Sequence, residues 1–124
     1  MLRTGTVRRM QSTTPYRRAD ILLVEFPFTD LSGRMQRPAV VLSGDDFNQS
    51  GRDLIVAQIT SNVSTQRVGD HVISGWQQAG LLKPSVARAK LATLMTSKVR
   101  RTLGRMPAAD MMGIEGRIRA VLRL

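Results

Sequence analysis

Two polar side chains of complementary chemistry stand at the ends of apolar segments in the first half of the chain. Arg37 comes immediately before Pro38, which opens the apolar segment 38–43, and Thr60 lies at the end of segment 53–61. Proline lacks an N–H and is tolerated at the first position of a strand, so the guanidinium is expected at the mouth of that strand. The short connection favours pairing of the two segments, which would bring Arg37 and Thr60 to one rim of a sheet. A guanidinium forks onto phosphate oxygens and a hydroxyl donates a further hydrogen bond, so this pair suits an anionic ligand.

The segments that would position this pair indicate a small, mainly β domain. Apolar runs predict strands over residues 20–26, 38–43, 53–61, 70–74, 85–95 with a break, and 99–105, with loops at 27–37 and 75–84. A helix is predicted from about 107 to 123, because Pro107 suits the first helical position and Asp110 the first turn. Its apolar stripe comprises Met111, Ile114, Ile118, Val121 and Leu122. Short strands, hairpin-sized loops and one terminal helix predict a strongly bent antiparallel sheet that closes into a barrel.

Composition limits the class of protein. A chain of 124 residues, 42% of them hydrophobic, can bury one modest core but cannot hold two domains. It has no cysteine, so a disulfide framework or a thiolate metal site is excluded and a reducing cytoplasm is the expected location. No apolar run approaches the roughly 20 residues of a membrane span. We therefore expect a soluble cytoplasmic protein.

The net charge of +10 is concentrated at the two ends of the sequence. Residues 1–18 contribute +5, residues 19–97 contribute 0 and residues 98–124 contribute +5. Clustered guanidiniums release counterions from a phosphate backbone, so this pattern suits a polyanion such as nucleic acid. An acidic protein partner fits equally well. A solvated basic surface that only keeps the protein soluble is the third interpretation.

Residues 1–15 are expected to be a flexible basic arm that precedes a single domain over 16–124. The arm lacks the apolar core of a secretory signal. A transit peptide, or an overlong gene model with Met10 as the true start, are alternatives.

His71 is the only histidine and lies in an apparent strand, so a structural or surface role is expected for it. No Cys, His or carboxylate cluster has metal-ligand spacing, so neither a metal nor a cofactor is expected.

Five short motifs follow one another in a fixed order. They are Arg18-Ala-Asp20 before an apolar strand, Phe26-Pro-Phe-Thr-Asp-Leu-Ser-Gly33, Arg37-Pro-Ala-Val-Val-Leu-Ser43, Gln58-Ile-Thr-Ser61 and Gly80-Leu-Leu-Lys-Pro-Ser-Val86. Each is common alone, but in this order they resemble the MazF/PemK family of toxin endoribonucleases over about residues 16–124. The resemblance implies a small SH3-like antiparallel barrel of the MazF/CcdB toxin type with a C-terminal helix. It also implies a two-fold homodimer whose RNA groove lies near the interface.

The resemblance implies a toxin of a type II toxin–antitoxin system that cleaves single-stranded RNA without a metal. Attack by the RNA's own 2′-hydroxyl would leave a 2′,3′-cyclic phosphate and a 5′-hydroxyl. Such cleavage needs a proton acceptor, a proton donor and positive charge at the phosphorane. One histidine cannot supply a two-histidine mechanism within a subunit, so the catalytic candidates are Arg37 and Thr60. The family assigns the matching arginine a general acid/base role, but arginine is a poor base at neutral pH, and the secure part of its role is electrostatic.

Seven further residues are expected to contact RNA. They are Arg18, Phe28, Arg34, Gln58, Ser61, Trp76 and Lys83. Ser61 ranks below Thr60 because neighbours along a strand point to opposite faces, whereas Gln58 shares the face of Thr60. Trp76 could instead be a core plug or a dimer contact. Arg37 could simply pair with Asp20 or Asp30, and Thr60 could be an ordinary strand-end residue.

The chain departs from the family pattern at several positions. Ala19 replaces a glycine found in many members, at a cost of about 1 kcal/mol if the position needs positive φ. The first loop is short and lacks a glutamate, so the cleaved RNA sequence is not predicted. Two other classes of function compete with the enzyme: a DNA gyrase inhibitor that relies on its C-terminal helix, and a catalytically weak RNA- or protein-binding relative. For the toxin, the expected partner is an acidic antitoxin whose disordered segment covers the RNA groove.

Overall fold

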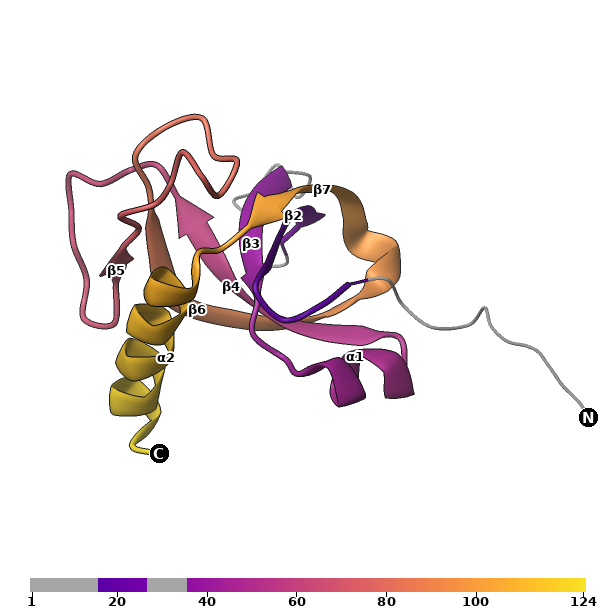
Figure 1. Cartoon of the computed structure of the whole chain (residues 1–124). Helices are drawn as coiled ribbons and strands as arrows, with labels where there is room; N and C mark the ends of the chain where they lie inside the picture. The colour runs from indigo at the N-terminus through magenta and orange to yellow at the C-terminus, as the bar shows by residue number, and fades with distance from the viewer. Residues whose placement is uncertain (1–15, 27–35) are drawn as a thin grey trace, which may run out of the picture.

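The computed structural model describes residues 16–26 and 36–124, and within them six strands form one antiparallel sheet. The strands are β2 (Asp20–Glu25), β3 (Gln36–Val41), β4 (Asp53–Thr60), β5 (His71–Val72), β6 (Val86–Met95) and β7 (Val99–Arg105). Their order is β5-β6-β4-β3-β2-β7, and the sheet curls strongly (Figure 1). The predicted mainly β fold with a C-terminal helix is confirmed. The sheet keeps two edges, β5 and β7, and is therefore not the fully closed barrel that we predicted.

The helices differ from the prediction in one respect. Helix α2 (Ala108–Leu122) matches the predicted helix to within one residue at each end, with Pro107 preceding its first residue. Helix α1 (Asp45–Ser50) was not predicted. The predicted strand 70–74 is reduced to His71–Val72. Along the chain, α1 follows β3, whereas α2 ends the chain and lies beside β5 and β6 (Figure 1).

Both faces of the sheet are buried, because successive residues of each strand enter different clusters. Ile21 belongs to one core cluster and its neighbour Leu22 to the other. The first cluster is covered by α2 and by the segment from Ile73 to Leu81. The second lies on the other face and includes Phe26, against which the curled sheet closes. Each fully buried side chain of this size contributes about 1.5 to 3 kcal/mol to folding.

Asp110, in the first turn of α2, fastens the helix to the sheet. One carboxylate oxygen lies 2.8 Å from Nε2 of His71 and accepts the Ser74 N–H at 2.9 Å, and the other accepts the Gly75 N–H at 2.9 Å. The His71 ring packs on Gly113, where an added Cβ would lie 2.2 Å from Cε1 of the ring. His71 therefore has the structural role that the sequence predicts.

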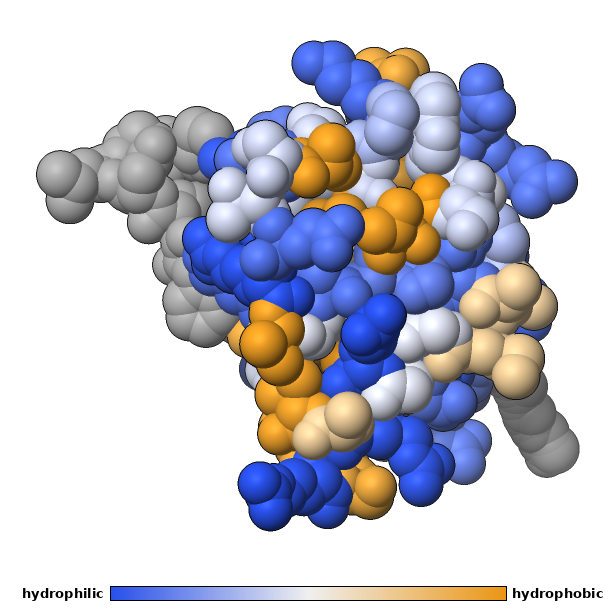
Figure 2. Space-filling model, turned by 90° about the vertical axis from the view of Figure 1, so that its left-hand side faces the viewer, coloured by the Kyte–Doolittle hydropathy of each residue, from blue (hydrophilic) through white to orange (hydrophobic). Residues whose placement is uncertain are grey.

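Exposed hydrophobic side chains are scattered over the surface rather than gathered on one face. In the predicted helical stripe Met111 and Ile114 are buried, whereas Val121 and Leu122 are about half exposed. The face that carries β5 and α2 is mainly hydrophilic, with hydrophobic side chains between (Figure 2). In the part of the chain that the structure covers, no helix is long and apolar enough to cross a membrane.

One residue adopts the strained backbone that the family resemblance suggested. Ala19 has φ of 79°, in the left-handed region that disfavours residues with a Cβ. Its methyl group is buried in the core cluster beneath α2. The family glycine is thus replaced at a position where the backbone does need positive φ, and the burial of the methyl group offsets part of the strain.

Candidate active site

A pocket of about 460 Å³ opens where β2, β3, β4 and β7 approach the segment 80–85. The strands contribute Leu23, Arg37, Pro38, Ile59, Thr60, Arg101, Thr102 and Leu103, and the segments that follow β4 and precede β6 contribute Ser61, Gly80, Leu81, Leu82, Lys83 and Ser85. The pocket therefore has an apolar floor and a polar rim. Four of the nine residues predicted for the site line it, namely Arg37, Thr60, Ser61 and Lys83.

The two catalytic candidates lie on neighbouring strands. The pairing of β3 with β4 runs from Val41 opposite Val56 to Ala39 opposite Gln58, and Arg37 and Thr60 each lie two residues beyond this last pair. Both residues line the pocket. The two side chains thus meet at one pocket, as the two apolar segments and the short connection between them led us to expect.

The Thr60 hydroxyl is held so that its proton can be donated. Its Oγ1 accepts the backbone N–H of Asn62 at 3.1 Å. A hydroxyl that accepts at its oxygen still carries one O–H donor. Because the accepted bond fixes the oxygen, the remaining proton is available to an oxygen atom of a ligand in the pocket.

Three cationic side chains line the pocket, and we call Arg37, Lys83 and Arg101 the pocket cations. Among the lining residues that belong to 16–26 and 36–124, none is Asp or Glu. None of the three is within ion-pair distance of a carboxylate in residues 16–26 or 36–124. Their positive charge is therefore not neutralised by this part of the chain, and an anionic ligand can supply the missing partner.

The alternative pairing of Arg37 with Asp20 does not occur. Asp20 accepts instead from Nη1 of Arg105 at 2.8 Å and from the backbone N–H of Arg17 at 2.8 Å. Asp30, the other predicted partner, lies outside the described residues. Within the described ranges, no group of three or more His, Cys, Asp or Glu side chains could hold a metal ion.

The wall formed by segment 80–85 depends on close backbone packing against β7. Gly80 has φ of +86°, and an added Cβ would lie 2.3 Å from the carbonyl oxygen of Leu103. A Cβ on Gly104 would lie 2.0 Å from the carbonyl oxygen of Ala79. Two glycines therefore let this segment rest on β7, and this contact brings Lys83 and Arg101 to the same pocket.

Other predicted RNA contacts lie elsewhere. Gln58 is partly exposed but does not line the pocket, and Trp76 is partly buried against the core cluster under α2. Arg18 lines a different pocket, where its guanidinium contacts the Leu42 carbonyl oxygen and Oε2 of Glu115. Phe28 and Arg34 lie outside the described residues. The RNA contacts of Arg18, Gln58 and Trp76 thus stay predictions that the geometry of the pocket does not support.

Two details of the site differ from the sequence interpretation. Ser61 lines the same pocket as Thr60, because β4 ends at Thr60 and the strict alternation of a strand does not extend to Ser61. Arg101 was not predicted. It lies opposite Leu23 on the neighbouring strand β2, and Leu23 also faces Pro38 on β3, so three adjacent strands carry one row of the pocket. Only this register identifies Arg101, since no motif marks it.

Several solved structures share this fold. The Mycobacterium tuberculosis toxin MazF-mt6 is 19% identical, with a TM-score of 0.70, and the match covers 85% of this chain and 97% of that one. An endoribonuclease from a mycobacterial species is 17% identical, with a TM-score of 0.72 and coverage of 92% and 97%. A mycobacterial endoribonuclease in complex with its cognate antitoxin is 18% identical, with a TM-score of 0.71 and coverage of 88% and 97%. At these identities the likeness establishes the fold alone.

Sequence comparison adds the family. No curated protein sequence matches the chain. The family described as PemK-like, MazF-like toxin of type II toxin–antitoxin systems matches residues 17–122, which is nearly the whole chain. The match includes the pocket and the helix that covers the sheet. This chain therefore belongs to the PemK-like, MazF-like toxins of type II toxin–antitoxin systems.

Proposed function

We propose that this chain is an endoribonuclease that cleaves single-stranded RNA in the cytoplasm without a metal ion, by attack of the RNA's 2′-hydroxyl on the adjacent phosphate. The observation that carries the proposal is the pocket itself, in which the pocket cations and the Thr60 hydroxyl meet and the described part of the chain contributes no carboxylate to the lining. Two structurally similar proteins are endoribonucleases, which supports the same class of reaction.

In this proposal the pocket stabilises the negative charge that develops on the scissile phosphate. Arg37 donates two parallel N–H bonds to nonbridging oxygens, and Thr60 donates its hydroxyl proton to one of them. Lys83 and Arg101 extend the positive field over the neighbouring phosphates. The P–O5′ bond breaks as the 2′-oxygen bonds to phosphorus, the 2′-hydroxyl loses its proton and the departing 5′-oxygen gains one. The products are a 2′,3′-cyclic phosphate and a 5′-hydroxyl.

Product analysis tests this reaction directly. Purified protein is incubated with single-stranded RNA in excess EDTA, and the new ends are identified by mass spectrometry. Cleavage with cyclic phosphate and 5′-hydroxyl ends is expected. Products that carry 5′-phosphates, or activity abolished by EDTA, would contradict the proposal.

The proposed partner is an acidic antitoxin, as the mycobacterial complex with a cognate antitoxin suggests. The net charge of +10 and the pocket cations, which have no carboxylate partner among the described residues, would attract a flexible acidic chain that covers Arg37. Its affinity should fall as salt rises, because part of the binding energy comes from screened charge pairs. Binding without salt dependence, or binding that leaves RNA cleavage unchanged, would contradict this mode of neutralisation.

We also expect a two-fold symmetric homodimer. Small domains gain stability by pairing, and α2 leaves Met112, Val121 and Leu122 exposed for a partner surface. Light scattering at tens of micromolar should give the mass of a dimer. A monomer at that concentration would contradict the expectation.

A further inference from the structure

The loop of residues 61–70, which joins β4 to β5, is held in place without apolar burial. Residues 61–68 are exposed, Gly69 is partly exposed, and Asp70 alone is buried. Its two large apolar side chains point to solvent, since Val63 is 43% and Val68 93% exposed. The loop begins directly after Thr60, so its position affects the catalytic hydroxyl. Polar bonds must therefore fix it.

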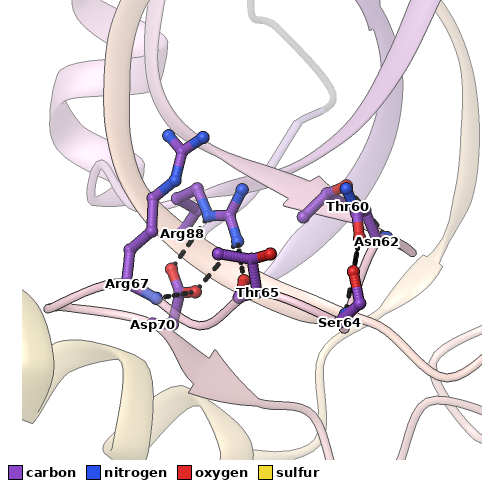
Figure 3. Close-up of polar contacts among 7 residues, drawn as sticks. All are labelled: Thr60, Asn62, Ser64, Thr65, Arg67, Asp70 and Arg88. Atoms are coloured by element: carbon purple, nitrogen blue, oxygen red, sulfur yellow. Dashed lines mark hydrogen bonds and ion pairs between the residues drawn. The ribbon is translucent and has the colours of Figure 1, made fainter.

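The side chain of Arg88, on β6, supplies the hydrogen bonds that tie this loop to the sheet. Nε of Arg88 donates to Oδ1 of Asp70 at 3.0 Å, and Nη2 donates to Oδ2 at 3.0 Å, a bidentate arrangement (Figure 3). The same Nη2 donates to the carbonyl oxygen of Thr65 at 3.1 Å. The side chains of Arg88 and Asp70 are only 11% and 3% exposed. Arg88 therefore contacts the loop at both its middle and its end.

The sheet places Arg88 at this point through an irregularity in β6. Ala57 of β4 lies opposite Leu91, but Ile59 lies opposite Ala87, so two steps along β4 span four along β6. The extra residues form a bulge that redirects the Arg88 side chain out of the regular ladder. The neighbouring bulge residue Ala89 approaches the loop as well, since a Cβ on Gly69 would lie 2.8 Å from the Cβ of Ala89.

A turn over residues 67–70, at the end of the loop, adds further hydrogen bonds around Asp70. The backbone N–H of Arg67 donates to Oδ2 of Asp70 at 2.8 Å, and the N–H of Asp70 donates to the Arg67 carbonyl at 3.0 Å. Gly69 has φ of +95°, which this turn requires. The Asp70 carboxylate thus joins the turn to the guanidinium.

The anchored half of the loop is continuous with the half that contacts Thr60. Ser64, next to Thr65 in the chain, donates its hydroxyl to Oδ1 of Asn62 at 2.7 Å. The N–H of Asn62 in turn donates to Oγ1 of Thr60 at 3.1 Å. Figure 3 shows the two sets of bonds on one stretch of chain, with Thr65 between them. Movement of Thr65 would therefore shift Ser64 and Asn62, and with them the bond that orients the Thr60 oxygen.

We propose that Arg88 and Asp70 act as positioning residues, whose ion pair holds loop 61–70 so that the Thr60 hydroxyl points into the pocket. The inference rests on the proposed RNA cleavage for its kinetic consequence, but the claim about the loop does not. Arg88 acts through the loop rather than on RNA, because its guanidinium is almost fully buried and does not line the pocket. Burial raises the pKa of Asp70, but the hydrogen bonds from Arg88 and from the Arg67 N–H, together with the positive charge of both arginines, lower that pKa below its ordinary value, so the pair is charged at neutral pH.

The test compares Arg88→Met with Arg105→Met in the full-length protein. Each change removes one guanidinium from an ion pair, since Arg105 pairs with Asp20 on the far side of the sheet. Hydrogen exchange of peptides that cover residues 61–70 reports on the loop, and steady-state cleavage reports on the site. Arg88→Lys and Asp70→Asn are measured beside them because they keep the size of the side chain and are milder. If Arg88→Met does not fold, these two variants decide the question.

The inference predicts that exchange of the loop, including the Asn62 amide, rises in Arg88→Met and not in Arg105→Met. It predicts that kcat falls severalfold in Arg88→Met, by no more than the roughly tenfold loss expected when the Thr60 hydroxyl is removed, with KM within about threefold, and that Arg88→Lys lies between Arg88→Met and the wild type. A general loss of folding would not give this split. Unchanged loop exchange, or faster exchange with unchanged kcat, would overturn the inference while the proposed function stands. If the wild type cleaves no RNA, the proposed function is wrong, and the exchange comparison alone decides whether the ion pair holds the loop.

Discussion

The charges of two regions of the molecule differ in their pairing: those of the candidate pocket, and those of the seam between loop 61–70 and α2, which is formed by Asp70, His71, Arg88 and Asp110. In the seam, Asp70 accepts from Arg88 and from a backbone N–H, and Asp110 contacts His71 and accepts two backbone N–H groups. Both carboxylates are nearly inaccessible to solvent. Buried charges of this kind are tolerated only when they are paired and hydrogen-bonded, so the pairing is a condition of folding.

In the pocket the three cations have no such partner among the described residues. Arg37 is half-buried, while Lys83 and Arg101 are exposed. Water solvates these cations in the free protein, so they reduce the stability of the folded state only slightly. They also retain their capacity to bind an anion. The two groups of charges therefore differ in whether they have a partner in the free protein. The paired charges of the seam stabilise the fold, whereas the pocket cations are available to an anionic ligand. Changes in the seam should therefore reduce stability first, and changes in the pocket should reduce activity alone.

The largest expected effect is on stability and comes from the seam. Asp70→Ala leaves the Arg88 guanidinium buried without its carboxylate, and should lower the free energy of unfolding by about 3 to 5 kcal/mol. Chemical denaturation measures this change. The exposed residue Asp53 provides the control, since Asp53→Ala should change stability by less than about 0.5 kcal/mol. Similar effects of the two substitutions would remove the distinction between paired and solvated charge.

Arg37→Ala should reduce activity and leave stability nearly unchanged, the reverse of Asp70→Ala. Loss of a preorganised donor to the developing charge should slow RNA cleavage by about 10² to 10³, while the melting temperature stays close to that of the wild type. Arg52→Ala is the matched control, because it removes an exposed arginine that does not line the pocket. Steady-state cleavage assays at one salt concentration compare the three proteins. An equal loss of rate in both variants would indicate that general positive charge, rather than the pocket, carries the activity.

Thr60→Ala should have a smaller effect, of about tenfold on kcat, since one hydrogen bond to a charged oxygen is worth about 1.5 kcal/mol. Thr60→Ser retains the hydroxyl and the acceptor for the Asn62 N–H, so it should keep most of the rate. Single-turnover cleavage measures the chemical step for both variants. A serine variant as slow as the alanine variant would show that the methyl group of Thr60 matters more than its hydroxyl.

The smallest effect is a dependence of stability on acid pH. Burial raises the pKa of Asp70 and of Asp110, but the side-chain hydrogen bonds from Arg88 and from His71, the backbone N–H groups that each carboxylate accepts and the nearby positive charges together hold both pKa values below the ordinary 3.8. The folded state thus binds these protons more weakly than the unfolded state, so the stabilisation is complete above about pH 4 and disappears as pH falls through the lowered values. Unfolding measured from about pH 2 to 6 should show this decline, with a shallower slope in Asp110→Asn. Identical slopes would contradict it.

Much of the fold was predictable from the sequence, because most strands and helix α2 follow local patterns of apolar residues. Apolar runs identified the long strands, and the spacing of apolar residues identified α2. Helix α1 was not predicted, since the sequence around Asp45 and Asp46 has the composition of a turn and the helix has only six residues. The two-residue strand β5 is equally short for a pattern to define.

The residues that line the pocket were predictable where they lie on strands joined by a short connection or, as for Lys83, in a recognisable motif. Arg37 and Thr60 were identified because a short connection joins their strands. Arg101 was not, because its place depends on the pairing of β2 with β7, which contains two register shifts. The Arg88–Asp70 pair depends on the bulge in β6. The sequence predicted a break in that strand, but not the direction in which the break would turn the Arg88 side chain. Long-range register therefore limits what one sequence can indicate about a site.

Arginine side-chain NMR tests the central claim most directly, because it observes both kinds of charge in one experiment. The protein is titrated with a short single-stranded RNA that carries a 2′-O-methyl group at every position and therefore cannot be cleaved by 2′-hydroxyl attack. The Nε–H resonances of Arg37 and Arg101 should shift with the same affinity, and those of Arg88 and Arg105 should stay in place. Shifts confined to Arg18 and Arg105, which line the other pocket, would show that the anion binds elsewhere and would contradict the account.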